Sequence, residues 1–312
     1  MTKVIVATPV PENRKELFTS IEDAEITFID RTNVTIDEIK DAEVILGNLP
    51  LSLVKECPEL KWLQLDSAGA NTYSSLDDSV ILTNASGAYG TAISEHMIGC
   101  VLMVMKNLAR YLDIQKEHEF TNLGSVNTLT ASKVLSVGMG DIGSNFARKM
   151  NALGAEVYGV RRSVHEKPSY CADMYTMENM DEIIGECDVV ALSLPETEET
   201  IHLFDEARLR KMKKGAILVN VGRGSAIVTE DLLKVMKEGY LSGVCLDVTD
   251  PEPLPKNHPL WNTEHVYITP HISGRFNAAV TYDFVLNIFR TNLMHYLNNE
   301  PLEHVVNKKL GY

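Results

Sequence analysis

Three side chains of types used in carbonyl chemistry each follow a segment predicted to be a strand. Arg223 comes after the apolar run 216–221, Glu252 after 243–248, and His271 after 266–270. Loops at the carboxyl ends of strands form the ligand crevice of such folds, so we expect these side chains to share it. An arginine can hold a carboxylate and polarise a carbonyl, an imidazolium can donate a proton, and a carboxylate can orient that imidazolium. Each residue alone is more often an ordinary loop residue, but together they suit the reduction of a 2-oxo acid.

A glycine-rich turn upstream predicts a dinucleotide site. The segment VLSVGMGDIGS holds Gly138, Gly140 and Gly143 in GxGxxG spacing between a predicted strand and a predicted helix, and the strand EVYGV follows. Such glycines permit a tight turn, the approach of a pyrophosphate, and close packing of helix and strand, while the helix N-terminus offers N–H groups to phosphate. We expect cofactor contacts here, including Asp141 and Ile142. The alternative is a glycine-rich turn without a ligand.

The end of the next strand indicates which dinucleotide binds. At this place NAD sites usually carry Asp or Glu, which accepts hydrogen bonds from the ribose 2′-hydroxyl. Here the strand ends in Arg161, Arg162 and Ser163. A guanidinium pairs well with a phosphate, so we predict NADP(H) with these residues around the 2′-phosphate. The alternative is that an arginine is solvated and that NAD is also used.

Strands and helices alternate from the first residues, which predicts an α/β fold with mostly parallel sheets. Two βα series are separated by one long helical pattern over 92–119, which could cross between domains, and by a turn-rich stretch at 121–132. A final helix, at roughly 276–297, is expected to return the chain to the first domain. The predicted strands are 3–9, 24–30, 42–48, 60–66 and 80–85, followed by KVLSVG, AEVYGV, CDVVALSLP, GAILVNV, GVCLDV and HVYITP.

Composition argues against several classes of protein. The 312-residue chain has a net charge of −14, which disfavours a nucleic-acid partner. Its five cysteines include no CxxC pair and suggest neither a disulfide framework nor a metal site. The N-terminal residues predict a strand rather than a signal peptide. The most apolar helical stretch is too short to span a bilayer. We therefore expect a cytoplasmic protein with no membrane partner.

Together the motifs resemble the D-isomer-specific 2-hydroxyacid dehydrogenase family, which includes glyoxylate/hydroxypyruvate reductases, D-lactate dehydrogenases and 3-phosphoglycerate dehydrogenases. The resemblance covers essentially the whole chain and implies two doubly wound parallel-sheet domains. A Rossmann cofactor domain (99–279) would be inserted in a flavodoxin-like substrate domain (1–98 and 280–312). The family also implies a homodimer packed through the cofactor domains. The motifs that carry the resemblance are GMGDIG, SLPETEET, VNVGRGSAI, LDVTDPEPLPKNHPLW and TPHISG.

The resemblance assigns roles in the second domain. Arg223, Glu252 and His271 match the family's catalytic set, and Asp247 matches its nicotinamide-side aspartate. The arginine at position 161 departs from the aspartate often found at the ribose position, which again favours NADP. The other expected cofactor contacts are Pro195, Thr200, Val221 and Gly222.

The resemblance also implies a substrate loop in the first domain. The segment DSAGAN matches it, with the N–H groups of Ala68, Gly69 and Ala70 offered to a carboxylate. Asp66, just before this loop, is expected to disfavour a phosphorylated substrate if it faces the site, and Arg275 could offset its charge.

The sequence therefore predicts an enzyme that reduces small 2-oxo acids to D-2-hydroxy acids with a preference for NADP(H). His271 would act as general acid and base, and Arg223 would also bind the substrate. One alternative is an NAD-dependent member such as a phosphoglycerate or D-lactate dehydrogenase, and another is a dinucleotide-sensing regulator with little catalysis. The complete Arg–Glu–His set favours an enzyme, and the sequence leaves the identity of the acid open.

Overall fold

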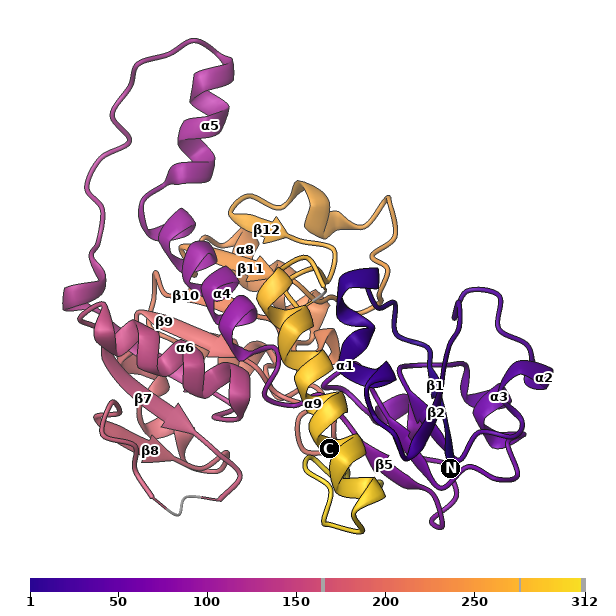
Figure 1. Cartoon of the computed structure of the whole chain (residues 1–312). Coiled ribbons are helices and arrows are strands. Elements are labelled where there is room, and N and C mark those ends of the chain that lie inside the picture. The colour runs from indigo at the N-terminus through magenta and orange to yellow at the C-terminus, as the bar shows by residue number, and fades with distance from the viewer. Residues whose placement is uncertain (164–165, 275, 310–312) are drawn as a thin grey trace. The chain divides into compact units, whose positions relative to one another are not determined.

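The computed structural model describes residues 1–163, 166–274 and 276–309, and the chain divides into two compact units. One unit is Met1–Tyr89 with Ala278–Tyr312, and the other is Gly90–Asn277. The first boundary follows residue 89 rather than 98, because the helix that begins at Gly90 packs along its length with the second unit. Each unit is built on one sheet of parallel strands (Figure 1), which confirms the predicted α/β class.

The sheet of the first unit has five strands in the order β2-β1-β3-β4-β5, the flavodoxin-like order. Strands β3 and β4 are buried along their whole length, as expected for parallel strands covered on both faces. The strands are β1 (Thr2–Val6), β2 (Ala24–Phe28), β3 (Val44–Leu46), β4 (Trp62–Gln64) and β5 (Ile81–Thr83), and the short helices are α1 (Glu16–Thr19), α2 (Ile36–Ile39) and α3 (Leu51–Lys55).

The C-terminal helix α9 (Ala279–Leu297) belongs to the first unit, which confirms the predicted return of the chain. The ring of Tyr296 stacks on Trp62 with centroids 5.3 Å apart. The buried Asn292 amide donates a 2.8 Å hydrogen bond to Gln64 Oε1 on β4. These contacts fix the helix to strand β4, which leads into the predicted substrate loop.

The sheet of the second unit has seven strands in the order β12-β11-β10-β9-β6-β7-β8. The strand order reverses between β6 and β9, and ligands of such sheets bind at this kind of switch point. Strand β8 was not predicted, because three residues beginning with Asp carry too little hydrophobic pattern. The strands are β6 (Lys133–Val137), β7 (Glu156–Val160), β8 (Asp173–Tyr175), β9 (Val189–Leu192), β10 (Ile217–Asn220), β11 (Gly243–Leu246) and β12 (Val266–Ile268), and helix α6 (Asp141–Ala152) follows β6.

The prediction of one long helix over 92–119 is wrong. The structure has two helices, α4 (Gly90–Met105) and α5 (Leu108–Lys116), separated at Asn107, whose backbone is left-handed at φ 55°. Helix α4 packs on α6, β10 and β11, whereas α5 has no buried residue. None of the helices in the described part of the chain is long and apolar enough to cross a membrane.

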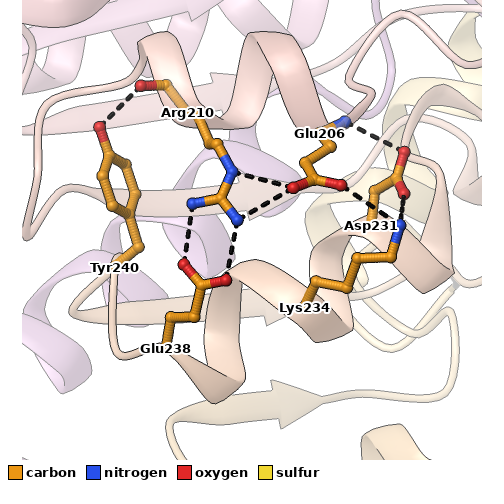
Figure 2. Close-up of polar contacts among 6 residues, drawn as sticks. All are labelled: Glu206, Arg210, Asp231, Lys234, Glu238 and Tyr240. Atoms are coloured by element: carbon orange, nitrogen blue, oxygen red, sulfur yellow. Dashed lines mark hydrogen bonds and ion pairs between the residues drawn. The ribbon is translucent and has the colours of Figure 1, made fainter.

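Helices α7 (Glu206–Lys211) and α8 (Thr229–Lys237) are joined by a network of ion pairs (Figure 2). Arg210 makes two 2.8 Å hydrogen bonds to the carboxylate of Glu238, and its Nε donates to Glu206 at 3.0 Å. Lys234 bridges Glu206 and Asp231. Most of these charges are at least one third exposed, so we assign the network a role in keeping the two helices aligned rather than a large share of stability.

Candidate active site

The predicted cofactor turn lies between β6 and the N-terminus of α6, at the switch point of the sheet. Gly138 has a left-handed φ of 95°, and a Cβ atom on Gly143 would lie 1.7 Å from the Gly138 carbonyl oxygen. At Gly140 a Cβ atom would meet nothing within 4 Å, so this glycine faces open space. The N-cap residue of α6 is Gly140, which has no side chain that could cap the helix. The turn is therefore tightly packed at Gly143 and open at Gly140. The free N–H groups of the first turn of α6 are available at the open side.

Two serines that sequence reasoning missed hold the turn in shape. Ser193 Oγ donates to the Gly138 carbonyl at 2.8 Å, and Ser136 Oγ donates to the Gly143 carbonyl at 3.1 Å. Ser136 lies within β6 and Ser193 directly follows β9. A single hydroxyl in or beside an apolar strand does not indicate a function in the sequence. Their partners are backbone atoms that only the folded turn brings within reach.

The side chain of Asp141, a predicted cofactor contact, is engaged within the protein. Its carboxylate accepts 2.7 Å from the Gly90 amide and 3.0 Å from the side-chain amide of Asn145. It thereby joins the first residue of α4 to the first turn of α6. A contact of Asp141 or Ile142 with the cofactor stays a prediction, carried by their main-chain N–H groups.

The strand-end arginines take two different positions. Arg161 donates from Nε and Nη2 to the Met139 carbonyl at 2.9 and 2.6 Å, so its guanidinium closes on the glycine turn. Arg162 and Ser163 are exposed beside it. Positive charge thus lies next to the predicted phosphate site, but Arg161 also has a structural function.

The structure brings two members of the predicted catalytic set into direct contact. His271 Nδ1 and Glu252 Oε1 are 2.7 Å apart, and both side chains are 42% exposed. His271 has a left-handed backbone at φ 51°, a conformation that costs energy outside glycine and often occurs at functional residues. Because Nδ1 is held by the carboxylate, Nε2 is the nitrogen left to exchange a proton.

Asp247 holds the histidine loop rather than projecting away from it. Its buried carboxylate accepts hydrogen bonds from Thr269 Oγ1 at 2.6 Å and from the amides of Ile272 and Ser273 at 3.0 Å each. The Ser273 hydroxyl donates a further, short hydrogen bond, and the Asp247 carbonyl accepts 2.8 Å from the His271 amide. Asp247 therefore sets the position of His271, and its predicted contact with the nicotinamide stays a prediction.

The loop of Arg223 is shaped by a buried asparagine that sequence reasoning also missed. Asn220 donates 2.9 Å to the Arg223 carbonyl and accepts 3.0 Å from the Gly222 amide. A Cβ atom on Gly224 would lie 2.0 Å from the carbonyl carbon of Thr249. The Arg223 loop thus lies against the backbone of the loop that carries Glu252.

The 193–200 segment packs on the same loop. A Cβ atom on the buried Gly222 would lie 2.6 Å from the Leu194 carbonyl oxygen. The buried Thr200 donates 2.7 Å to the Pro195 carbonyl and accepts 2.8 Å from the Thr197 amide. Val221, in the same stretch as Gly222, is also buried. These contacts give the predicted cofactor-side residues a fixed backbone, and their contact with a cofactor stays a prediction.

The predicted substrate loop follows β4 in the first unit. Ser67 Oγ donates 2.7 Å to the Gly69 carbonyl, and the Asn84 amide donates 2.8 Å to the Ala68 carbonyl. Ala70 is buried. The loop is thus held through its carbonyl groups, and the binding of a carboxylate by its N–H groups stays a prediction.

Asp66 does not support the argument against a phosphorylated substrate. Its buried carboxylate accepts 2.7 Å from Arg31 Nη1 and 2.7 Å from Thr8 Oγ1. The charge of Asp66 is therefore compensated inside the first unit. Arg275, which was expected to offset it, lies outside the described residues.

Comparison with known proteins agrees with the family that the sequence motifs resemble. A model of the NAD-binding domain of D-isomer specific 2-hydroxyacid dehydrogenases matches residues 98–273. A glyoxylate reductase from Thermofilum pendens is 28% identical over 310 residues, which cover 96% of this chain and 86% of the relative.

Two solved structures are similar over nearly the whole chain. One is a D-isomer specific 2-hydroxyacid dehydrogenase family protein from Aeromonas salmonicida subsp. salmonicida, with TM-score 0.89, 29% identity, and coverage of 98% of this chain and 99% of the other. The other is an NADPH-dependent glyoxylate/hydroxypyruvate reductase from Sinorhizobium meliloti in complex with NADP and sulfate, with TM-score 0.86, 25% identity, and coverage of 100% of both chains.

The glycine turn fits the dinucleotide that these comparisons indicate. Its backbone is packed too closely at Gly143 for any side chain, yet it is open at Gly140, the N-cap residue of α6, where a Cβ atom would meet nothing within 4 Å. The turn, the N–H groups of α6 and the adjacent guanidinium of Arg161 together suit a pyrophosphate.

Substitutions at the two glycines should separate cofactor binding from folding. We expect Gly140→Val to weaken NADPH binding at least about tenfold with a nearly unchanged Tm, because its side chain enters open space where phosphate would lie. Gly143→Ala should instead destabilise the fold by about 1–3 kcal/mol through overpacking. Fluorescence titration with NADPH and thermal unfolding measure the two effects. A large loss of Tm in Gly140→Val would contradict this division.

Proposed function

The chain belongs to the D-isomer-specific 2-hydroxyacid dehydrogenase family, and we propose that it is an NADP(H)-preferring reductase of small 2-oxo acids. Family membership gives the reaction class: NAD(P)-dependent interconversion of 2-oxo and 2-hydroxy acids. The observation that carries the proposed catalytic mechanism is the 2.7 Å pair of His271 and Glu252 on the loops after β12 and β11.

In this proposal each catalytic side chain has one task. In reduction, the His271 imidazolium donates the Nε2 proton to the carbonyl oxygen, and in oxidation the neutral ring accepts the hydroxyl proton. Glu252 holds Nδ1–H and stabilises the imidazolium, while Asp247 keeps the histidine backbone in place. Arg223 binds the substrate carboxylate and polarises the carbonyl. When bound, NADPH supplies the hydride that reduces the carbonyl carbon.

The preference for NADP(H) is supported by charge at the end of β7. Arg162 and Ser163 are exposed there, and Arg161 is fixed against the glycine turn. A phosphate dianion gains charge-assisted hydrogen bonds from guanidinium groups, and a ribose hydroxyl gains much less. In the similar reductase from Sinorhizobium meliloti, NADP is part of the solved complex.

One observation favours use of NAD as a second possibility. Arg161 directs two of its N–H groups to the Met139 carbonyl, so part of its hydrogen-bonding capacity is spent inside the protein. If Arg162 also adds little to binding of the 2′-phosphate, NADPH would bind only slightly more tightly than NADH. The enzyme would then use NADH nearly as well. The reaction class would be the same in either case.

Removal of the general acid should abolish turnover and preserve cofactor binding. We expect His271→Ala to lower kcat by about 10²–10⁴-fold, since proton transfer to the carbonyl oxygen loses its donor. The Kd for NADPH should change little. His265→Ala is a matched control, because His265 also has a left-handed backbone, at φ 63°. Unchanged turnover in His271→Ala would refute the assigned role.

The cofactor preference can be tested with the exposed arginine. Initial rates of NADPH and NADH oxidation over a panel of 2-oxo acids should favour NADPH and identify the best acid. Arg162→Ser should then lower kcat/KM for NADPH by about 10–100-fold, the value of one charge-assisted contact, and leave the value for NADH unchanged. Arg148→Ser removes an exposed arginine from α6 and serves as control. Equal losses with both cofactors would exclude a 2′-phosphate contact.

We also propose that the protein is a homodimer. Helix α5 and the segment after it extend away from the sheet of their unit (Figure 1). Leu108, Leu112 and Phe120 on this arm are 51%, 59% and 109% exposed. Such an apolar surface suits contact with a second copy of the chain.

Light scattering tests the dimer directly. We expect twice the chain mass for the native protein, and a monomer for the double variant Leu112→Glu with Phe120→Ser, because both changes make contact with a partner unfavourable. Ile81→Gln, at an exposed apolar residue of the first unit, should stay dimeric. A mass of one chain for the native protein at high concentration would exclude the proposal.

We further propose a cytoplasmic location. All five cysteines are free thiols, as a reducing compartment would keep them.

A further inference from the structure

Two cysteines from distant parts of the chain meet in the second unit. Cys100 lies on α4 and Cys245 on β11, and Cys245 Sγ is 3.8 Å from the Cys100 carbonyl oxygen. The Cys245 thiol thus donates to the backbone of the residue that carries the second thiol. The proposed reaction uses neither of them, so the pair is without an assigned function.

The close approach follows from the packing of α4 on β11. A Cβ atom on Gly243 would lie 2.5 Å from a methyl group of Val104, so the absence of a side chain there lets the helix lie directly on the strand. Cys245 is two residues after Gly243, on the same face of the sheet. Cys100 is one helical turn before Val104, on the same face of the helix. The two cysteines therefore lie on the facing surfaces of helix and strand.

The environment makes Cys100 the more reactive thiol. The neighbouring Cys245 thiol, and then the His96 imidazole one turn earlier on α4, lower the pKa of Cys100 against the opposing effect of burial. The same contact with Cys100 and burial raise the pKa of Cys245. Cys100 is partly exposed, whereas Cys245 is buried. Cys100 is therefore the more readily ionised thiol of the pair.

The other cysteines lack these features. Cys57, Cys171 and Cys187 are buried, and burial raises the pKa of each of their thiols, to about 11 for Cys57 and about 12 for Cys187. A thiolate is the nucleophilic form, so these three should react slowly. Among the five cysteines, selective oxidation is therefore expected only at Cys100 and Cys245.

We propose that Cys100 and Cys245 form a peroxide-reactive dithiol. The Cys100 sulfur attacks one peroxide oxygen, the O–O bond breaks, and Cys100 becomes a sulfenic acid while water or an alcohol leaves. The Cys245 sulfur then attacks the sulfenic sulfur and expels water, with its thiol proton leaving in that water. In total, two thiols are oxidised to one disulfide and one peroxide is reduced.

Contacts from this pair reach the active-site anchor. His96 Nε2 is 3.4 Å from Thr269 Oγ1, and Thr269 Oγ1 donates 2.6 Å to the carboxylate of Asp247. Asp247 is also two residues beyond Cys245, immediately after strand β11. A disulfide would tie α4 to β11 beside His96, so it should disturb the loop that holds His271. The expected result is a reversible loss of turnover, and this consequence rests on the proposed function.

Mass spectrometry tests the dithiol without any substrate. The full-length protein is treated with a slight excess of hydrogen peroxide and mapped by peptide analysis under non-reducing conditions. We expect a Cys100–Cys245 disulfide that dithiothreitol reverses. Cys245→Ser should instead accumulate a sulfenic acid at Cys100 that dimedone traps, and Cys100→Ser should form neither product. Cys171→Ser is the matched control and should form the disulfide normally.

Two further measurements separate the parts of the proposal. His96→Gln should slow the oxidation of Cys100 by roughly tenfold, because a smaller fraction of the thiol is ionised. The rate of 2-oxo acid reduction should fall on oxidation and recover with dithiothreitol in the native protein, but stay constant in Cys100→Ser. A free Cys100 in the mapped peptides, or oxidation spread evenly over all five cysteines, would overturn the dithiol. A disulfide that forms without loss of turnover would overturn only its connection to the active site.

Discussion

The hydrogen bonds to the Asp247 carboxylate are the interactions on which the candidate site depends. A buried carboxylate is costly unless its oxygens are satisfied, and here a threonine hydroxyl, two amides and a serine hydroxyl converge on it. All of these donors belong to the loop after β12. Asp247, which directly follows β11, therefore fixes the loop after β12. That loop in turn places His271 Nδ1 2.7 Å from Glu252 Oε1.

Close contact between backbones is the second constraint on the site. The loops after β9, β10 and β11 approach so closely that side chains at Gly222 and Gly224 would collide with neighbouring main-chain atoms. The buried Asn220 satisfies the polar groups that this packing leaves inside. Arg223 is thereby placed on a rigid support, which catalytic positioning requires. The same principle lets α4 lie on β11 at Gly243 and brings the two thiols together.

Much of the fold could be predicted from local sequence. Runs such as VVAL and ILVN are rich in apolar and β-branched residues, and they form fully buried strands. The failures have physical causes. The helical pattern continues through 106–108, yet Asn107 adopts a left-handed backbone and ends α4 there. Strand β8 exists because β7 offers an edge for pairing, not because its own residues favour a strand.

The alternation of strands and helices, the glycine turn after β6, and the polar residues that follow strands β10, β11 and β12 could all be predicted from the sequence. These features depend on residue type and short-range spacing. Three contacts could be known only from the folded chain: Arg161 closes on the Met139 carbonyl, Asp141 joins α6 to α4, and Cys245 lies against Cys100. Each of these contacts joins residues far apart in the chain, and the choice of partner depends on how elements pack, which no local pattern specifies.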